Sequence, residues 1–381
     1  MISFIVMFMF WECLPAQIPA LNSWPKAKAA IFLDFDGQIV EGTAWNHGVR
    51  INAQPSHLSN DDIRNIFRRV ADDFRPFNVN ITTSQEVYNL APIDKRIRII
   101  ITPTHSWYGN APGSSFIGSF HWGDDTPAWV FIDMLGNDVK KIAAVASHEI
   151  GHSLGLQHQS VYDENGSKLS EFNGGSLNRL TGWAPIMGAN LYSACTAWIT
   201  GHSGINRDSL QSDVTLIAGA WNGFGFRSDD YADDLLKAER IPLDDEHFSF
   251  KGIINEASDA DVFSLDLPVR AELVMQGINF ELGENKMQPD DIVVDILGER
   301  ADTVGTYHLS RLISGRIDLI LQRGTYYFVI RSGGDKKKKL ASMSYYALSG
   351  SVVPEENLKQ LTFQNNTKDQ LIQIKMPKNE E

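Results

Sequence analysis

The stretch from His148 to His158, HEIGHSLGLQH, constrains the fold of this chain more than any other segment. His148 and His152 are four positions apart, so on a helix both imidazoles project from one face, about one turn apart. Gly155 lets the backbone leave the helix with a positive φ, so that His158 can turn back toward the other two rings. The segment therefore predicts a helix that ends at Gly155 and three histidines that meet at one point.

This spacing suits a zinc ion, which histidine nitrogens bind at about 2.0–2.1 Å. Three protein ligands leave one coordination position open, as in catalytic rather than structural zinc sites. Glu149 follows the first ligand, where its carboxylate can act on a water molecule without being a ligand itself. We therefore expect His148, His152 and His158 to bind Zn²⁺ and Glu149 to act as general base and acid. The alternative interpretation is a helix with surface or capped histidines.

The segments before this motif predict an α/β layer. Ala29–Phe35 reads as a buried strand, Ser59 begins an amphipathic helix, and Asp138 begins the helix that carries the motif. Three further β-rich runs lie between the two helices, at 78–83, 96–102 and 129–133. After Gly155 the chain is rich in Gly, Asn, Ser and Trp up to Gly204, and a short helix is expected at 210–218.

From Phe248 the pattern is all-β. Seven short strands are expected, and this number in about a hundred residues is typical of a β-sandwich. The expected strands span 248–253, 261–267, 271–276, 292–297, 317–321, 325–330 and 345–353. The acidic, polar stretch 229–245 is a candidate linker between the two parts.

Charge argues against some partners. Acidic residues outnumber basic ones by 47 to 34, which gives a formal net charge of -13. A negative surface repels nucleic-acid phosphates and anionic membranes, so neither is expected as a partner. Only two cysteines, Cys13 and Cys195, are present, and so few cysteines do not define the compartment.

The N-terminal segment, 1–20, begins with the almost wholly apolar run Met1–Trp11. This run is shorter than the roughly 20 residues of a membrane helix, so no transmembrane span is expected. It has the length of a signal-peptide core, although no Lys or Arg precedes it. We interpret it as a poor or truncated export signal; a misassigned start or an N-terminal strand is the alternative.

The motif HEIGHSLGLQH resembles the zinc signature of the metzincin metalloproteases. The resemblance extends to Pro185-Ile186-Met187-Gly188, which is similar to the methionine turn that places Met187 beneath the three imidazoles in that clan. Two features depart from particular subfamilies. Ala189 stands where astacin-like and serralysin-like enzymes have a tyrosine, with Tyr192 as a weak substitute, and Gln159 follows the third histidine, so the subfamily stays open.

The metzincin resemblance, over roughly 28–225, implies a twisted mixed sheet, an active-site helix and a small subdomain that contains the methionine turn. It also implies an antiparallel edge strand that binds extended peptides, for which Ser115–Trp122 occupies the corresponding place. A plain loop with aromatic core contacts is the alternative for this segment.

The C-terminal part is similar to the bacterial pre-peptidase C-terminal domain, a β-sandwich attached to secreted peptidases. The residues that carry this similarity are Asp259–Ser264 (DADVFS) and Gly324–Phe328 (GTYYF). Asp259 and Asp261 are candidate ligands for Ca²⁺, which prefers carboxylate oxygens. The alternative is that both aspartates only form the turn before a strand.

Together these features predict an α+β fold with a metzincin-like domain at 21–235, a β-sandwich at 236–353 and a polar tail at 354–381. The expected function is a secreted zinc endopeptidase, extracellular or periplasmic, acting on proteins or peptides; the oligomeric state is left open. The alternative function is a surface-binding or adhesion protein with a vestigial zinc site. Glu149, whose loss would favour that alternative, is present.

The spacing of the three histidines generates the first prediction. Protein purified without chelators should contain about one zinc ion per chain, because three ligands at this spacing form one site. Elemental analysis of the purified protein measures this ratio. A preparation that is folded but contains no zinc would contradict the interpretation of the motif.

Overall fold

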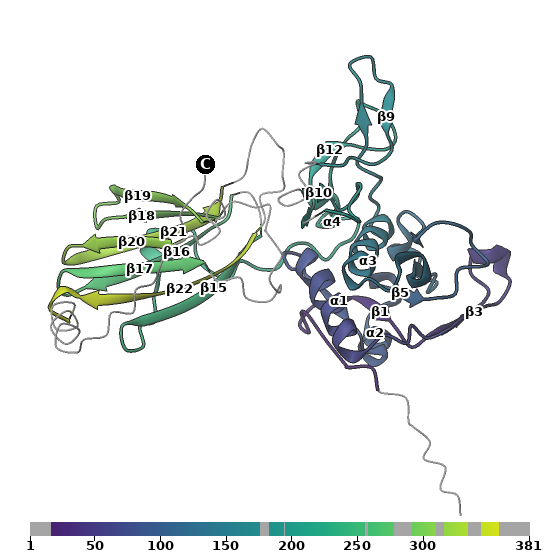
Figure 1. Cartoon of the computed structure of the whole chain (residues 1–381), viewed down its shortest axis with the longest axis horizontal. Coiled ribbons are helices and arrows are strands. Elements are labelled where there is room, and N and C mark those ends of the chain that lie inside the picture. The colour runs from purple at the N-terminus through teal and green to yellow at the C-terminus, as the bar shows by residue number, and fades with distance from the viewer. Residues whose placement is uncertain are drawn as a thin grey trace, which may run out of the picture. The chain divides into compact units, whose positions relative to one another are not determined.

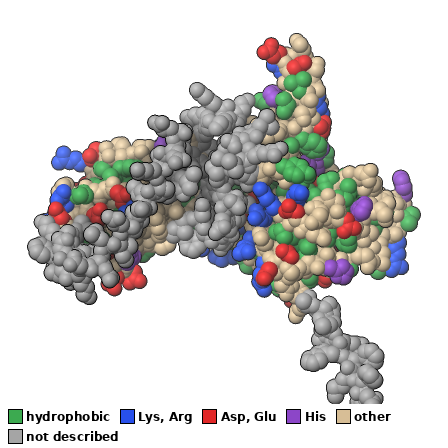
Figure 2. All heavy atoms as spheres, in the orientation of Figure 1, with side chains coloured by type: hydrophobic (Ala, Val, Ile, Leu, Met, Phe, Trp, Pro, Cys, Tyr) green, Lys and Arg blue, Asp and Glu red, His purple; other side chains and the backbone are tan. Residues whose placement is uncertain are grey.

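A computed structural model describes residues 17–175, 183–193, 195–255, 258–277, 292–309, 316–333 and 344–357 (Figure 1). The chain divides into two compact units between Phe226 and Arg227, ahead of the boundary at 235 expected from the sequence. The segment 1–20, expected to be a poor or truncated export signal, and the tail 354–381 lie mostly outside the described residues. On the face shown in Figure 2, the described acidic and basic side chains are interspersed on each unit.

The first unit is built on a five-stranded mixed sheet with the order β4-β1-β5-β7-β6. Its first four strands are parallel, and β6 pairs antiparallel with β7 at one edge. The strands are β1 (Ala29–Asp34), β4 (Val79–Thr82), β5 (Arg96–Thr102), β6 (Gly113–Ser114) and β7 (Ala128–Phe131). Every residue of β1 is buried, as expected for a parallel strand that is covered on both faces.

Two long helices pack on each other and support the histidine motif: α1 (Asn60–Asp73) and α3 (Val139–Ser153). Their N-terminal caps are Ser59, which accepts from Asp62 N, and Asp138, which accepts from the amides of residues 140 and 141. A 2.6 Å hydrogen bond from Ser147 Oγ to Asp73 Oδ2 joins the two helices directly before His148. This bond helps to fix the rotation of α3, and with it the direction of the histidine side chains.

Short elements complete the first unit. They are β2 (Gln38–Val40), β3 (Ile51–Ala53), α2 (Gln85–Leu90), β8 (Val161–Tyr162), β9 (Lys168–Ser170), β10 (Trp183–Pro185), β11 (Cys195–Ala197), β12 (Thr200–His202), β13 (Leu210–Ser212) and α4 (Asp213–Ile217). The hairpin β8–β9 projects from the rest of this unit (Figure 1).

Two local expectations differ from the structure. The antiparallel edge strand is β6, at Gly113–Ser114, and not Ser115–Trp122, which instead contains a 3₁₀ turn at Ser119–His121. The helix expected at 210–218 begins only at Asp213, because residues 210–212 pair with β12 as a strand. In both places a pairing across the chain decides the conformation, and local sequence does not show it.

The second unit contains two sheets that share one hydrophobic core. One sheet has the order β14-β16-β21-β18-β19 and the other β15-β22-β17-β20. The strands are β14 (Glu239–Arg240), β15 (His247–Ile254), β16 (Ala260–Leu267), β17 (Ala271–Gly277), β18 (Ile292–Leu297), β19 (Thr303–His308), β20 (Arg316–Leu321), β21 (Gly324–Ser332) and β22 (Ser344–Pro354). All seven expected strands are present, whereas β14 and β19 were missed; β19 is largely exposed and lacks an apolar face.

Candidate metal centre

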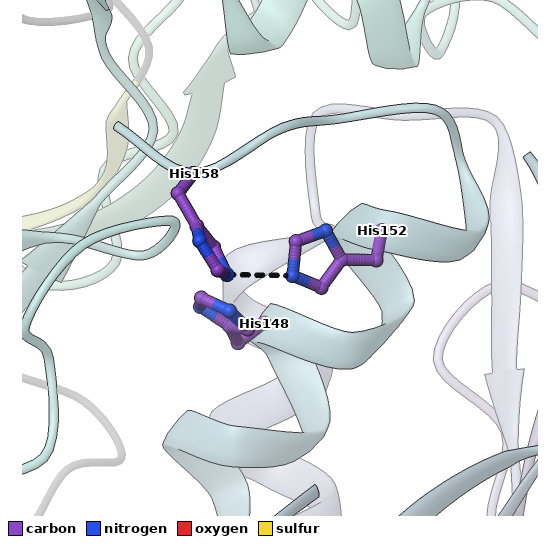
Figure 3. Close-up of side chains that lie close together, drawn as sticks. All are labelled: His148, His152 and His158. Carbon is purple, nitrogen blue, oxygen red and sulfur yellow. Dashed lines mark hydrogen bonds between the residues drawn. The ribbon is translucent and has the colours of Figure 1, made fainter. Parts of the chain in front are cut away.

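Three imidazoles converge at the C-terminal end of α3 (Figure 3). His148 and His152 come from successive turns of the helix, and His158 comes from the loop that follows it. The ring centres of His148 and His152 lie 4.7 Å apart, and that of His158 lies 5.3 and 4.8 Å from them. One nitrogen from each ring lies within 4.8 Å of the others, so the three can share one metal ion.

The turn after α3 brings His158 back to the helix. Gly155 has a φ of +99°, a conformation that side-chain-bearing residues rarely adopt. Its amide donates to His152 O, and the next amide, of Leu156, donates to Gly151 O. The expected helix end at Gly155 is therefore present, with these two bonds closing the last turn.

Each ring is oriented through its Nδ1 atom, which lies 2.7–2.8 Å from an oxygen acceptor. The acceptors are Ile186 O for His148, Leu156 O for His152 and Glu171 Oε1 for His158. A carbonyl or carboxylate oxygen can only accept, so Nδ1 carries the proton in each neutral ring. The Nε2 lone pair is then free in all three rings.

The free lone pairs of His152 and His158 face each other. Their Nε2 atoms are 3.1 Å apart, and neither carries a proton while both rings are neutral. Such a pair is repulsive unless a cation lies between the two nitrogens. Nitrogens bound to one tetrahedral zinc at about 2.0–2.1 Å lie about 3.3 Å apart, so the spacing fits this ion.

Burial keeps two of the imidazoles neutral in the metal-free protein. It lowers the pKa of His148 to about 3, and it lowers the pKa of His152 to about 4. Metal binding requires neutral imidazole, so protons compete little for these two ligands near neutral pH.

Glu149 points away from solvent beside the first ligand. Its side chain is 6% exposed, and its Oε2 has no hydrogen-bond partner among the described residues. Burial raises its pKa to about 8. Gly113 of β6 lies against it, since a Cβ atom at residue 113 would be 2.7 Å from Glu149 Oε1. The edge strand and the candidate general base are therefore adjacent.

The turn at Pro185–Gly188 lies under the site, closed by a 2.9 Å bond from Gly188 N to Pro185 O. Met187 is fully buried, and its Sδ would be 2.5 Å from a Cβ at residue 151. The methionine thus packs on the helix between the first two histidines. Tyr192 is 83% exposed and has Lys141 over its ring, so it does not take the place of the tyrosine found in some metzincins.

Two residues near the histidines were missed by sequence reasoning. Glu171 accepts from His158, and the ring of Phe172 lies 4.5 Å from that of His158. Burial alone would raise the pKa of Glu171, but hydrogen bonds from Lys168 and His158 lower it below its ordinary value. Both residues come from the irregular stretch after Gly155, where no spacing or motif singles them out.

The second unit brings a third aspartate to the two expected ones. Carboxylate oxygens of Asp229, Asp259 and Asp261 lie within 4.8 Å of one another. Oδ1 of Asp259 and Oδ1 of Asp261 are buried without a hydrogen-bond partner in the described part of the chain. Burial, together with the neighbouring aspartates, raises the pKa of Asp259 to about 7 and that of Asp261 to about 8. In the sequence, Asp229 lies in the polar stretch 229–245, and no spacing or motif singles it out.

Fold and site together define a protein with a mixed α/β unit that carries a three-histidine metal-binding arrangement. Residues 88–165 match the family model described as Matrixin, a metzincin family, and this segment contains α3 and all three histidines. The resemblance to metzincin zinc metalloproteases is therefore confirmed for the segment that carries the motif.

Other comparisons add less. No curated protein matches the chain. Among solved structures, the pre-peptidase C-terminal domain of collagenase from Bacillus anthracis aligns with 32% of this chain and 99% of its own, at 13% identity and a TM-score of 0.23. PliG, a periplasmic lysozyme inhibitor of Aeromonas hydrophila, aligns with 30% of this chain and 96% of its own, at 10% identity and a TM-score of 0.23. Likeness at this level assigns neither fold nor function. Among the described helices, none is both long and apolar enough to cross a membrane.

Burial of Glu149 generates a pH-dependent prediction for the zinc-free protein. The pKa of Glu149 is about 8 in the folded chain against an ordinary value of 4.5, so the unfolded chain releases this proton first. This group therefore costs the unaltered protein stability as the pH rises through this window, and Glu149→Gln lacks this contribution. The histidine contributions are common to both proteins and cancel.

We expect Glu149→Gln to gain stability relative to the unaltered protein between about pH 5 and about pH 9. Urea unfolding of both zinc-free proteins at the two pH values measures the difference in the free energy of unfolding. A difference that does not change with pH would show that Glu149 is not buried in this way.

Proposed function

We propose that this chain is a zinc-dependent endopeptidase that hydrolyses peptide bonds, with His148, His152 and His158 as metal ligands. One observation carries the proposal: one nitrogen from each of three imidazoles lies within 4.8 Å of the others, and Glu149, which follows the first of them in the chain, has a buried carboxylate oxygen without a hydrogen-bond partner among the described residues. The match of residues 88–165 to the matrixins supports it independently of geometry.

A zinc ion held there would polarise the scissile carbonyl and make a water molecule a better nucleophile. Glu149 takes a proton from the attacking water and passes it to the leaving amine, which completes the hydrolysis. A general base works best when its pKa is near the operating pH, and burial moves the pKa of Glu149 in that direction. Met187 and Gly155 support the site, the first by packing under α3 and the second by returning the chain to it.

The position of β6 favours an extended peptide or unfolded protein as substrate. Among the described strands, β6 pairs only with β7, so its other edge is available to a peptide strand. Gly113 of this strand lies against Glu149, so a peptide bound along the edge passes the candidate base. Secretion to an extracellular or periplasmic location stays a prediction.

The alternative, an adhesion protein with a vestigial zinc site, is less well supported. A vestigial site would not be expected to retain the general base, and Glu149 is present and buried beside the ligands. The matrixin match also covers the motif and not the C-terminal unit.

Two substitutions separate metal binding from chemistry. Glu149→Gln is close to isosteric and is not a ligand, so it should bind zinc like the unaltered protein but lose at least about 10²–10⁴-fold in activity. His158→Ala should lose zinc affinity itself, because one of three ligands is removed. Cleavage of an unfolded protein and zinc content measure the two properties.

Glu86→Gln, an exposed change of the same kind in α2, is the matched control and should leave both properties unchanged. Proteolysis by Glu149→Gln at the unaltered rate would refute the assignment of the base.

We also propose that Asp229, Asp259 and Asp261 bind Ca²⁺ in the second unit. The support is the pair of buried carboxylate oxygens that lack hydrogen-bond partners within the described residues. Such oxygens are costly to bury unless they are paired or coordinate a cation. Carboxylates are the ligands that Ca²⁺ prefers.

Calorimetric titration with Ca²⁺ tests this site. We expect saturable binding by the unaltered protein and none by Asp261→Asn, because one buried ligand oxygen is replaced by a neutral amide. Asp266→Asn, an exposed change in the same strand, is the control. Binding by Asp261→Asn equal to that of the control would show that calcium does not bind at these aspartates. Absence of binding by the unaltered protein would refute the proposed calcium site.

A further inference from the structure

His158 differs from the other two histidines in how it is held. His148 and His152 lie on α3 and are 9% exposed, and main-chain carbonyls orient both rings. His158 lies in a loop, its side chain is 26% exposed, and its Nδ1 bonds to a side chain, that of Glu171. The hydrogen bond that orients its Nδ1 therefore comes from a carboxylate thirteen residues further along the chain.

Glu171 is itself fixed by several contacts. Lys168 Nζ donates to Glu171 Oε2 at 2.7 Å and to Gly204 O at 2.6 Å. Ser160 Oγ donates to the main-chain oxygen of Glu171 at 2.6 Å. These bonds hold both the side chain and the backbone of Glu171, so its carboxylate is presented to His158 in one position.

Gly204 completes this arrangement. Its amide donates to His158 O at 2.7 Å, and its carbonyl accepts from Lys168. A Cβ at residue 204 would lie 3.2 Å from Glu171 Oε1 and 3.5 Å from His158 Cβ, so the backbone packs closely on the pair. His158, Glu171, Lys168 and Gly204 thus form a closed set of contacts between the base of the β8–β9 hairpin and the loop after β12.

Phe172 restrains the same ring from another direction. Its ring centre lies 4.5 Å from that of His158. The adjacent residues Glu171 and Phe172 therefore act on the same imidazole, one through a hydrogen bond at its edge and the other through ring packing.

We propose that Glu171, held by Lys168, is a positioning residue that orients His158 toward the metal. This inference rests on the zinc site proposed above. A carboxylate that accepts from Nδ1 keeps the proton there and leaves Nε2 as the ligand atom. The carboxylate also makes the Nε2 nitrogen a stronger electron-pair donor to the metal, and the negative charge of the carboxylate favours a nearby dication. Partners of this kind typically change metal affinity by about 10–100-fold.

Zinc affinity tests the inference without reliance on activity. Zinc-free protein is titrated with zinc in competition with a colorimetric chelator at neutral pH, for the unaltered chain, Glu171→Ala, Glu171→Gln and Glu164→Ala. Glu164 is the matched control: it lies in the turn of the same hairpin, where its main-chain oxygen accepts from Arg207.

We expect Glu171→Ala to bind zinc about 10–100-fold more weakly. Glu171→Gln should lie between Glu171→Ala and the unaltered protein, because it keeps an oxygen acceptor but loses the charge. Glu164→Ala should bind like the unaltered protein. The melting temperature of the zinc-free forms should barely change, since the Glu171 side chain is 45% exposed and ion pairs so exposed contribute little stability.

Unaltered affinity in Glu171→Ala, or an equal loss in Glu164→Ala, would overturn the positioning role while leaving the zinc site intact. If Glu171→Ala does not fold, Glu171→Gln decides, and unaltered affinity in that variant overturns the role. Absence of zinc binding by the unaltered protein would instead refute the proposed zinc function.

Discussion

The first unit depends on one constraint: three imidazoles must direct their Nε2 atoms to the same point. Nitrogens at such short separations repel one another unless a cation lies between them, so the surrounding structure has to hold each ring firmly. It does so by giving every Nδ1 an oxygen acceptor. The acceptors come from the loop after α3, from the turn that contains Met187 and from the segment after β9, which ties these three regions to the helix.

The helix that carries the first two histidines also fixes the position of Glu149. A buried carboxylate without a partner is destabilising in isolation, and its raised pKa reflects that cost. Gly113 packs closely on the Glu149 side chain, and a larger residue at position 113 would push that side chain out of its place. The helix pairing through Ser147 and Asp73 then fixes the register of α3 directly before the first ligand. Stability is therefore given up at the carboxylate for which the role of general base is proposed.

The local sequence pattern is sufficient to predict the motif helix, its three histidines and several buried strands. The spacing of His148, His152 and Gly155 predicted a helix, its end and the return of His158, because helical geometry alone relates these positions. Buried strands such as β1 and β5 were found because their runs are continuous and apolar. Glu171 and Asp229 were not found, since each joins its site through folding of an irregular segment whose path is set by contacts distant in sequence. β6 was misplaced for the same reason, as two residues paired with β7 carry no pattern of their own.

X-ray absorption at the zinc edge of the purified protein tests the central claim most directly, because it reports the atoms around the metal. The account predicts a first shell of light atoms at about 2.0–2.1 Å, with the outer-shell signature of three imidazoles. A shell containing sulfur at about 2.3 Å, or a signal with fewer than three imidazoles, would contradict it.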